Sequence, residues 1–348
     1  HTKFLRPHSC RSRGASLRAQ KFVLLALHYM IKNKLFKNVG IIGYGGYIPS
    51  GRVSVAEIAH KQGKSAEQVI VSLGVNQKAV ADRDEDTVTL AVEAGRRALK
   101  QAKIAPEKLG AILVGSESHP YAVKPTGSIV GEILGVGNDY LTVDLEFACK
   151  AGTSAIILIA GLIEAGLIDC GLAIGADVAQ AKPRDALEFT AGAGAGAFLL
   201  GNKKFTWLTE LNQIGSFTSD TPDFWRREGE KYPVHAGRFT AGPAYFRHVI
   251  ASTQNFLAKT KTKISDFDHV VLHMPNAKFP RRAAVKLGIT PVQLATGFLV
   301  PQIGNPYSAS SLLGLIAVLE QAKPKQRILV TSYGSGAGSD VLSFTVKS

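Results

Sequence analysis

Hydrophobic and polar positions along the chain follow two alternating patterns. Short apolar runs predict buried strands, and longer stretches with apolar residues three and four positions apart predict helices. The predicted strands cover residues 39–44, 109–115, 140–147, 171–176, 194–200, 269–274, 327–331 and 341–346. The predicted helices cover residues 55–62, 87–102, 126–134, 150–165, 245–259, 279–287 and 308–321. Asp86 precedes the second of these helices and is expected to cap it.

Strands and helices alternate twice, once before about residue 205 and again after it. This repetition predicts an α/β protein of two similar halves packed together. We expect a basic extension outside the fold at 1–38, a first half at 39–205 and a second half at 206–348. The helix after Asn305 takes the place in the second half that the helix after Cys149 takes in the first.

The first residues of the chain differ in composition from the rest. Residues 1–38 hold nine Lys and Arg and no Asp or Glu, and residues 1–29 follow neither the strand nor the helix period. An acid-free stretch rich in Arg and Ser is typical of an organellar transit peptide. Upstream sequence before a start at Met30 gives the same pattern, and we favour that interpretation.

The net charge of +14 is concentrated in that stretch, and the remaining chain carries only +5. A modest surface charge gives no reason to expect a nucleic-acid partner and is compatible with a small phosphate-bearing substrate. The apolar run at 22–27 is too short to span a bilayer, and the run at 155–176 is interrupted by Glu164 and Asp169. We therefore expect no membrane association.

Three cysteines, Cys10, Cys149 and Cys170, form no disulfide framework and have no CxxC spacing. This usage favours a reducing, cytoplasmic location. Cys170 precedes an apolar strand and is expected to lie in the core. The nine histidines lack the spacing of metal ligands, so we expect no metal. We also expect no bound cofactor.

Cys149 is the most informative residue of the chain. It lies where the strand 140–147 gives way to the helix 150–165, and a helix N-terminus favours thiolate over thiol. A nucleophile is one interpretation, and a small buried hydrophobic residue is the other.

A thiol nucleophile needs a proton acceptor or donor nearby, together with donors for a developing oxyanion. Glu117 and His273 each follow a buried strand, and Asn305 precedes a helix. Polar residues at strand ends gather in the sites of α/β folds. Taken singly, Glu117 fits a turn cap, His273 a core histidine and Asn305 a helix cap.

Four motifs contain these residues: Val114-Gly-Ser-Glu-Ser-His-Pro120, Phe147-Ala-Cys-Lys-Ala-Gly-Thr153, His273-Met-Pro-Asn-Ala-Lys278 and Gly304-Asn-Pro-Tyr-Ser308. Together they resemble the hydroxymethylglutaryl-CoA synthases of the thiolase superfamily, most strongly the archaeal form. The resemblance runs from about residue 39 to 346 and includes the segments 220–229, 237–240 and 332–336. It implies a thiolase-like fold, a five-layer αβαβα sandwich.

The resemblance also implies an acyltransferase of the mevalonate pathway. Cys149 would take the acetyl group of acetyl-CoA, and Glu117 would remove a proton from its methyl group. The carbanion would attack the ketone of acetoacetyl-CoA, whose oxygen His273 would polarise or protonate. Water would then release 3-hydroxy-3-methylglutaryl-CoA from the enzyme.

By the same resemblance, Thr190, Thr240, Asn305 and Ser335 contact substrate. Lys278 and Arg282 would bind the phosphates of coenzyme A, although a solvated basic helix face remains open for Arg282. Ser65 stands where the family often has an acidic residue near the adenine, which leaves that contact undecided.

Two other functions stay open. A β-ketoacyl-ACP synthase III-like enzyme shares the Cys, His and Asn but decarboxylates malonyl-ACP and needs no carboxylate base, so Glu117 distinguishes it. A non-catalytic subunit associated with a thiolase has no need of Glu117, Cys149 and His273 together. The resemblance further implies a homodimer and a complex with acetoacetyl-CoA thiolase and an OB-fold scaffold protein.

Overall fold

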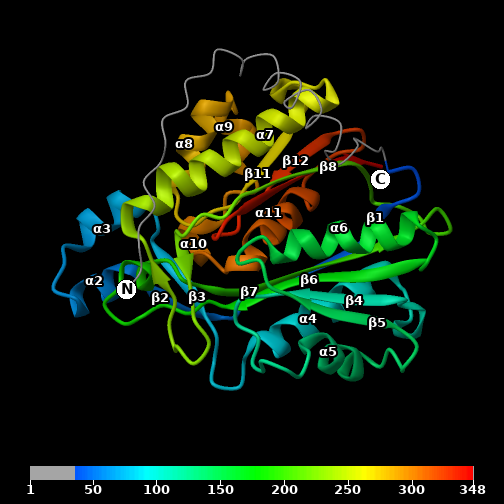
Figure 1. The fold of residues 1–348 in the computed structure, drawn as a ribbon, viewed down its shortest axis with the longest axis horizontal. Helices are drawn as coiled ribbons and strands as arrows, with labels where there is room; N and C mark the ends of the chain where they lie inside the picture. Colours follow the sequence, from blue (N-terminus) through cyan, green and yellow to red (C-terminus); the bar gives the residue numbers. More distant parts are fainter. Residues whose placement is uncertain (1–35, 348) are drawn as a thin grey trace, which may run out of the picture. The chain divides into compact units, whose positions relative to one another are not determined.

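A nine-stranded mixed sheet runs through the computed structural model, which describes residues 36–347 (Figure 1). The strand order is β11-β12-β13-β8-β1-β7-β6-β4-β5. The strands are β1 (Gly40–Tyr47), β4 (Ala111–Gly115), β5 (Leu141–Leu145), β6 (Cys170–Val178), β7 (Ala193–Gly201), β8 (Thr209–Thr218), β11 (His269–Leu272), β12 (Arg327–Thr331) and β13 (Gly338–Val346). Two small hairpins pair β2 (Gly51–Ser54) with β3 (Gln77–Val80) and β9 (Phe224–Trp225) with β10 (Val234–His235).

The large sheet consists of two arms that meet at β1 and β8. These two strands pair over only two positions, Gly40 with Glu210 and Ile41 with Thr209. Outward from this junction one arm runs β1-β7-β6-β4-β5 and the other runs β8-β13-β12-β11. Within the arms, β4 is parallel to β5 and β6, and β11 is parallel to β12. The arms therefore repeat one topology, with β5 as an additional edge strand in the first.

Helices cover both faces of the sheet and fill the space between its arms. The α-helices are α2 (Val55–Lys61), α3 (Ala66–Leu73), α4 (Thr87–Ala102), α5 (Thr126–Leu134), α6 (Ala151–Glu164), α7 (Arg247–Thr260), α8 (Lys278–Leu287), α9 (Pro291–Ala295), α10 (Val300–Ile303) and α11 (Ser310–Leu319). A π-helical turn, Ala241–Phe246, leads into α7, and a 3-10 turn, Tyr307–Ala309, leads into α11.

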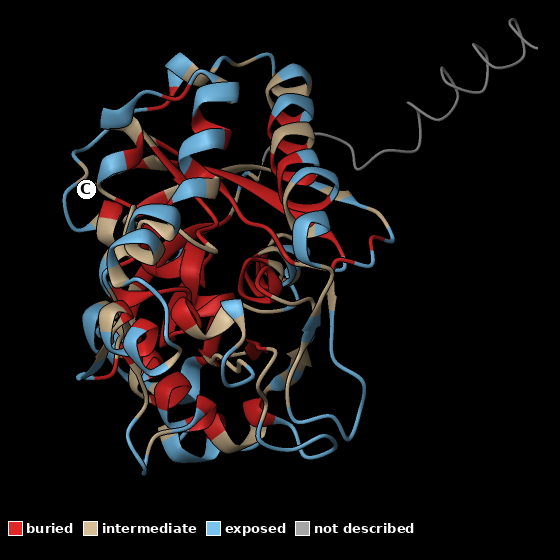
Figure 2. Ribbon diagram, turned by 90° about the vertical axis from the view of Figure 1, so that its left-hand side faces the viewer, coloured by how far each residue is buried: buried red, intermediate tan, exposed pale blue. Residues whose placement is uncertain are grey.

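Three apolar clusters stack these elements into layers. The largest joins α6 and α11 to the inner faces of both arms, whereas a second holds α4 against the first arm and a third holds α7 and α8 against the second. Figure 2 shows the buried residues in the middle and the exposed residues on the outward faces of the outer helices. The predicted five-layer αβαβα sandwich is confirmed.

The predicted strands and helices are all present, most with ends shifted by a few residues. The predicted cap is confirmed too: the Asp86 carboxylate accepts a hydrogen bond from the Thr89 amide at 2.9 Å. Cys170 lies fully buried in the core, as expected. The central strand β8 was not predicted, because its sequence is largely polar. The boundary at 205–206 falls in the turn before β8 and stays a prediction.

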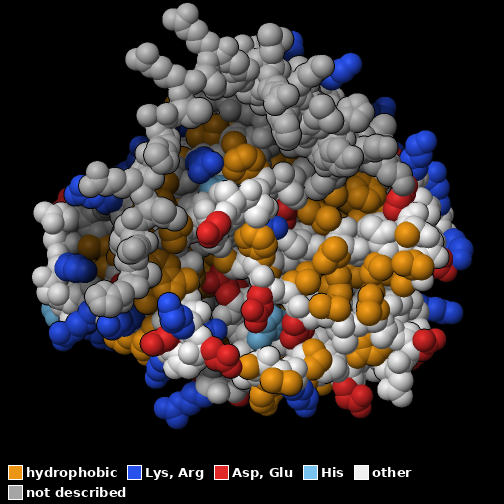
Figure 3. Space-filling model, viewed as in Figure 1, with side chains coloured by type: hydrophobic (Ala, Val, Ile, Leu, Met, Phe, Trp, Pro, Cys, Tyr) orange, Lys and Arg blue, Asp and Glu red, His pale blue; other side chains and the backbone are white. Residues whose placement is uncertain are grey.

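The predicted extension at 1–38 lies outside the described residues, apart from its last three positions. Within residues 36–347, none of the helices has the length and apolar character needed to cross a bilayer. Hydrophobic side chains also gather on the outer face that carries α6 and the neighbouring strands (Figure 3). The exposed large hydrophobic side chains of these elements are Leu141 and Val143 on β5 and Leu158 on α6.

Candidate active site

Cys149 lies on the turn between β5 and α6, two residues before the first residue of that helix. Ala148 adopts a left-handed backbone conformation with φ of 43°, which is rare for a residue with a side chain. The Ala151 amide donates to the Ala148 carbonyl at 3.1 Å and closes the turn. Tyr307, on the corresponding turn before α11, has a φ of 42°. Both arms thus carry a strained turn at the start of a central helix.

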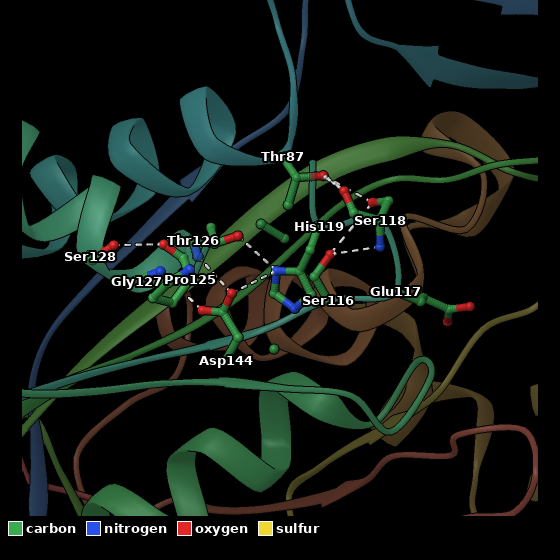
Figure 4. Close-up of polar contacts among 12 residues, drawn as sticks. Thr87, Ser116, Glu117, Ser118, His119, Pro125, Thr126, Gly127, Ser128 and Asp144 are labelled. Atoms are coloured by element: carbon green, nitrogen blue, oxygen red, sulfur yellow. Dashed lines mark hydrogen bonds and ion pairs between the residues drawn. The ribbon is translucent and has the colours of Figure 1, made fainter. Parts of the chain in front are cut away.

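Glu117 follows β4 on a loop whose backbone is firmly held. One carboxylate oxygen of Asp177, at the end of β6, accepts from the Ser116 hydroxyl, the Glu117 amide and the Ser118 hydroxyl at 2.7, 2.9 and 2.6 Å. Beyond them, His119 hydrogen-bonds the Thr126 hydroxyl at 2.8 Å. Figure 4 shows the Glu117 side chain pointing away from these anchored neighbours.

Cys149 and Glu117 form a direct pair. The Cys149 thiol donates to Oε1 of Glu117 across 3.1 Å. Burial, followed by the negative charge of Asp177, raises the pKa of Glu117 to about 8. Burial and the charge of Glu117 also raise the pKa of the Cys149 thiol well above its ordinary value. This direction is opposite to the one that the helix N-terminus predicts, because burial beside the charges of Glu117, Asp177 and Asp223 disfavours the thiolate.

His273 follows β11 just as Glu117 follows β4 in the other arm. It is buried, and burial lowers the pKa of its imidazole to about 3, so the ring is neutral. Its carbonyl accepts a hydrogen bond from the Tyr245 hydroxyl at 2.7 Å, which fixes the backbone. Its Nδ1 atom is buried without a hydrogen-bond partner in the described part of the chain. A neutral ring with a free nitrogen is suited to hydrogen bonding with a substrate.

Tyr333 connects the surroundings of His273 and Cys149. Its ring centroid lies 6.2 Å from that of His273. Burial raises the pKa of its hydroxyl, and the charges of Asp223 and Cys149 add to that rise. Gly334, the next residue along the chain, packs against the Phe147 carbonyl of the Cys149 turn. The Tyr333 hydroxyl donates to the Asp223 carboxylate at 2.6 Å. Tyr333 therefore lies between His273 of the second arm and the Cys149 turn of the first, in a region to which both arms contribute.

Asn305 and Thr190 lie side by side at the edge of this region. The backbone N–H of Asn305 donates to the backbone carbonyl of Thr190 at 2.6 Å. The Asn305 side-chain oxygen accepts from the Tyr307 amide at 3.1 Å, so Asn305 caps the turn before α11. Tyr307 in turn packs with Cys149 and Ala191 in a small buried cluster.

The other predicted binding residues lie farther out. Ser335 lies two positions after Tyr333, in the turn between β12 and β13, and the Thr240 hydroxyl donates to the Gly237 carbonyl within its own turn. Lys278 and Arg282 are exposed one helical turn apart on α8, and Arg282 covers the Phe246 ring at 4.9 Å. Ser65 caps α3 by accepting from the Gln68 amide at 3.3 Å. Their substrate contacts stay predictions.

Asp177, Asp223 and Tyr307 were missed by sequence reasoning. Asp177 had a usable signal, because it is a single acid directly after the apolar strand 171–176. Asp223 and Tyr307 lie within motifs that carried the resemblance, but no pattern indicated that they contact the reactive region. Among residues 36–347, no cluster of three or more His, Cys, Asp or Glu side chains is arranged to hold a metal ion.

Two family models match the chain. One describes the N-terminal part of hydroxymethylglutaryl-coenzyme A synthase and covers residues 35–204. The other describes the C-terminal part of 3-oxoacyl-[acyl-carrier-protein] synthase III and covers residues 257–347.

Full-length relatives agree with the first model. The hydroxymethylglutaryl-CoA synthase of Archaeoglobus fulgidus is 54% identical over 308 residues, which are 88% of this chain and 89% of that protein. The enzyme of the same name from Methanocaldococcus jannaschii is 54% identical over 307 residues, 88% of each chain.

Solved structures share the fold. A MvaS protein in complex with 3-hydroxy-3-methylglutaryl coenzyme A superposes with a TM-score of 0.83 at 26% identity, covering 90% of this chain and 84% of that one. The 3-oxoacyl-(acyl carrier protein) synthase III of Pseudomonas aeruginosa superposes with a TM-score of 0.81 at 22% identity, covering 90% and 99%. The second likeness shows the fold alone.

Proposed function

The chain belongs to the hydroxymethylglutaryl-CoA synthase family, and we propose that Cys149, Glu117 and His273 carry out its acyl transfer. The reaction condenses acetyl-CoA with acetoacetyl-CoA to 3-hydroxy-3-methylglutaryl-CoA, in the mevalonate pathway of isoprenoid precursor synthesis. The observation that carries the residue assignment is the hydrogen-bonded pair of Cys149 and Glu117. A nucleophile and a carboxylate base in contact are what a thioester condensation requires.

The first step is acetylation of Cys149. The sulfur attacks the acetyl carbonyl of acetyl-CoA, the thioester bond to CoA breaks, and the thiol proton ends on the departing CoA sulfur. Glu117 is 3.1 Å from the thiol and is positioned to relay that proton. We propose that the reaction uses no cofactor, and that acetyl-CoA and acetoacetyl-CoA take part as substrates.

The second step forms the new carbon–carbon bond. Glu117 removes a proton from the methyl group of the acetyl-cysteine, and the carbanion attacks the ketone carbon of acetoacetyl-CoA. A carboxylate with its pKa raised to about 8 is a stronger base than an ordinary one. The proton on Glu117 then passes to the new alkoxide, and water hydrolyses the thioester to free Cys149.

His273 acts on the ketone as a neutral hydrogen-bond donor. A pKa near 3 means that the ring carries no charge at neutral pH, so it polarises the oxygen by hydrogen bonding rather than as an imidazolium. We therefore favour the polarising role over the protonating role that the sequence left open.

The remaining assignments concern substrate binding. We propose that Thr190, Asn305 and Ser335 contact the acyl groups and the pantetheine, because they border the region around Cys149 and Tyr333. Thr240 ends the 3-10 turn Gly237–Thr240, which precedes the π-helical turn before α7, and is assigned by resemblance. Lys278 and Arg282 lie on one exposed face of α8, which suits the phosphates of coenzyme A.

We further propose a homodimer that pairs the two β5 edges. β5 ends the sheet, and an unpaired edge with exposed Leu141 and Val143 needs a cover. The hydrophobic face over α6 and its neighbouring strands extends the same surface (Figure 3). A cytoplasmic location and a complex with acetoacetyl-CoA thiolase and an OB-fold scaffold protein complete the proposal, and both rest on the sequence and its resemblance.

The test combines purified protein with acetyl-CoA and acetoacetyl-CoA. Loss of the acetoacetyl-CoA enolate absorbance is followed, and the product is identified by mass spectrometry. Formation of 3-hydroxy-3-methylglutaryl-CoA by the natural chain, and its absence with Cys149→Ala, is the expected result. Condensation of malonyl-ACP instead would assign the chain to the ketoacyl synthases whose fold it shares. Product formation by Cys149→Ala would refute the nucleophile.

A further inference from the structure

Lys150 occupies an unfavourable position directly after Cys149. It is the N-cap of α6, makes no side-chain cap and is only 6% exposed. Buried lysines are rare, and a cation at the positive end of a helix dipole is destabilising. Ser, Thr, Asp or Asn would be the favoured residues there. Groups outside the helix must therefore compensate for the charge.

Asp340 on β13 supplies most of that compensation. The Lys150 ammonium lies 3.1 and 3.0 Å from its two carboxylate oxygens. The same ammonium donates to the Ser154 hydroxyl at 2.9 Å and lies 4.1 Å from the centroid of the Phe147 ring. Both members of the ion pair are buried.

The ion pair connects the two arms of the sheet. Asp340 also accepts from the hydroxyls of Thr153 and Ser154 on α6, each at 3.1 Å, and from Ser216 on β8 at 2.8 Å. One carboxylate therefore fastens the first turn of α6 to β13 and β8. Lys150, the partner of Asp340 in the ion pair, directly follows Cys149 in the sequence.

The turn between β12 and β13 packs closely against the Cys149 turn. A Cβ added at Gly338 would lie 2.7 Å from the Phe147 ring and 2.9 Å from the Lys150 side chain. One added at Gly334 would lie 2.4 Å from the Phe147 carbonyl. Tyr333, whose ring neighbours His273, immediately precedes this turn. The Cys149 turn and the turn between β12 and β13 are thus so close that neither glycine could carry a side chain without moving its neighbours.

We propose that Lys150 and Asp340 are positioning residues. Their buried ion pair fixes the Cys149 turn against the second arm and so holds the Cys149 sulfur in position to attack the acetyl carbonyl of acetyl-CoA. The inference rests on the proposed acetylation of Cys149. Stability alone does not account for the pair, because a buried ion pair is often no more stabilising than neutral residues of similar volume.

The decisive variant is Lys150→Met with Asp340→Asn. Lys150→Met alone leaves a buried unpaired carboxylate and is expected to unfold readily, whereas the double variant removes both charges and keeps the volume. We expect it to unfold at a urea concentration near that of the natural chain. We also expect acetylation of Cys149 by acetyl-CoA, followed by intact-protein mass without acetoacetyl-CoA, to be about 100-fold slower.

Two readouts separate positioning from stability. Alkylation of Cys149 by iodoacetamide, a small reagent with no fixed binding mode, is expected to stay within a few-fold of the natural rate. Lys204→Met is the matched control, because it breaks the exposed Lys204–Asp169 pair and leaves acetylation unchanged.

A stable double variant that is acetylated at the natural rate would reduce the pair to a structural role and overturn the proposal. If the double variant does not fold, Lys150→Arg is tested instead. It retains the charge but places a larger head group among the closely packed neighbours of the Lys150 ammonium. Slow acetylation of that variant supports positioning, and an unchanged rate overturns it. Failure of the natural chain to acetylate Cys149 would instead refute the proposed function.

Discussion

Cys149 and Glu117 show how burial sets the chemistry of two ordinary side chains. Burial raises the pKa of both groups, and Glu117 raises that of the Cys149 thiol further, because a negative charge on the sulfur is disfavoured beside a carboxylate and away from water. The thiol hydrogen bond is the main influence that lowers the pKa of Glu117. Acetylation of Cys149 removes that donor. We therefore expect Glu117 to be a stronger base in the acetyl-enzyme, where it removes a proton from the acetyl methyl group.

Glu117→Ala separates the two steps of the reaction. Without the carboxylate the Cys149 thiol ionises more easily, so acetyl-enzyme is still expected to form from acetyl-CoA. Condensation with acetoacetyl-CoA should fall by about 10²- to 10⁴-fold, the usual contribution of a general base. Intact-protein mass reports the first step and product formation the second. Near-natural condensation by this variant would show that Glu117 is not the base.

The raised pKa of Glu117 also predicts how stability depends on pH. A carboxyl group that titrates near 4.5 when unfolded and at about 8 when folded binds more protons in the folded state between those values. The free energy of unfolding contributed by this group is therefore full below about pH 4.5 and is lost as the pH rises through about 8.

Glu117→Gln removes this dependence, because the amide does not titrate. In urea unfolding, the variant should gain stability relative to the natural chain between about pH 4.5 and about pH 8, by a difference of the order of 5 kcal/mol. The gap should stop growing above that range. A difference that is the same at every pH would mean that Glu117 is not desolvated in the folded protein.

The sequence indicated the candidate reactive residues more clearly than the residues that hold them in place. Cys149, Glu117 and His273 were found because each ends a recognisable strand. Asp177 holds the Glu117 loop through three hydrogen bonds, yet those donors and their acceptor are about 60 positions apart in the chain. The pKa of Cys149 was mispredicted for the same reason, since local sequence shows the helix dipole but not the carboxylate brought beside it.

Among the helices and strands, the sequence pattern was most informative where the segment itself carries the signals of its structure, such as an amphipathic period and a capping residue. The helix α4 has an amphipathic period and a capping residue, and its bounds agree with the prediction. The strand β8 is held by its neighbours β1 and β13 instead of by an apolar pattern, so it was invisible to periodicity.

The capping of α4 is directly testable. Asp86→Ala removes the acceptor for the Thr89 amide and is expected to lower the free energy of unfolding by about 1 kcal/mol in urea titration. Asp84→Ala, which removes an exposed carboxylate two residues earlier, serves as the control and should leave stability nearly unchanged. Equal losses from both substitutions would assign the effect to charge and not to the cap.

For the whole molecule, the repeated topology determines where the site lies. Glu117 follows β4, and His273 follows β11 in the equivalent place of the other arm. The two strained turns at Ala148 and Tyr307 begin the paired central helices α6 and α11. Each arm therefore contributes candidate site residues from equivalent strand ends, as the repeat suspected from the sequence implies.

The arms are not equal, and the difference predicts the oligomeric state. Only the first arm carries the additional edge strand β5, with Leu141 and Val143 about half exposed. Pairing of two β5 edges would continue the sheet between protomers and bury these side chains. Val143→Lys should place a desolvated charge at that contact and convert a dimer to a monomer in sedimentation velocity. Val285→Lys makes the same change at an exposed position of α8 and should leave the dimer intact. A dimer that survives Val143→Lys would mean that subunits associate through a surface other than β5.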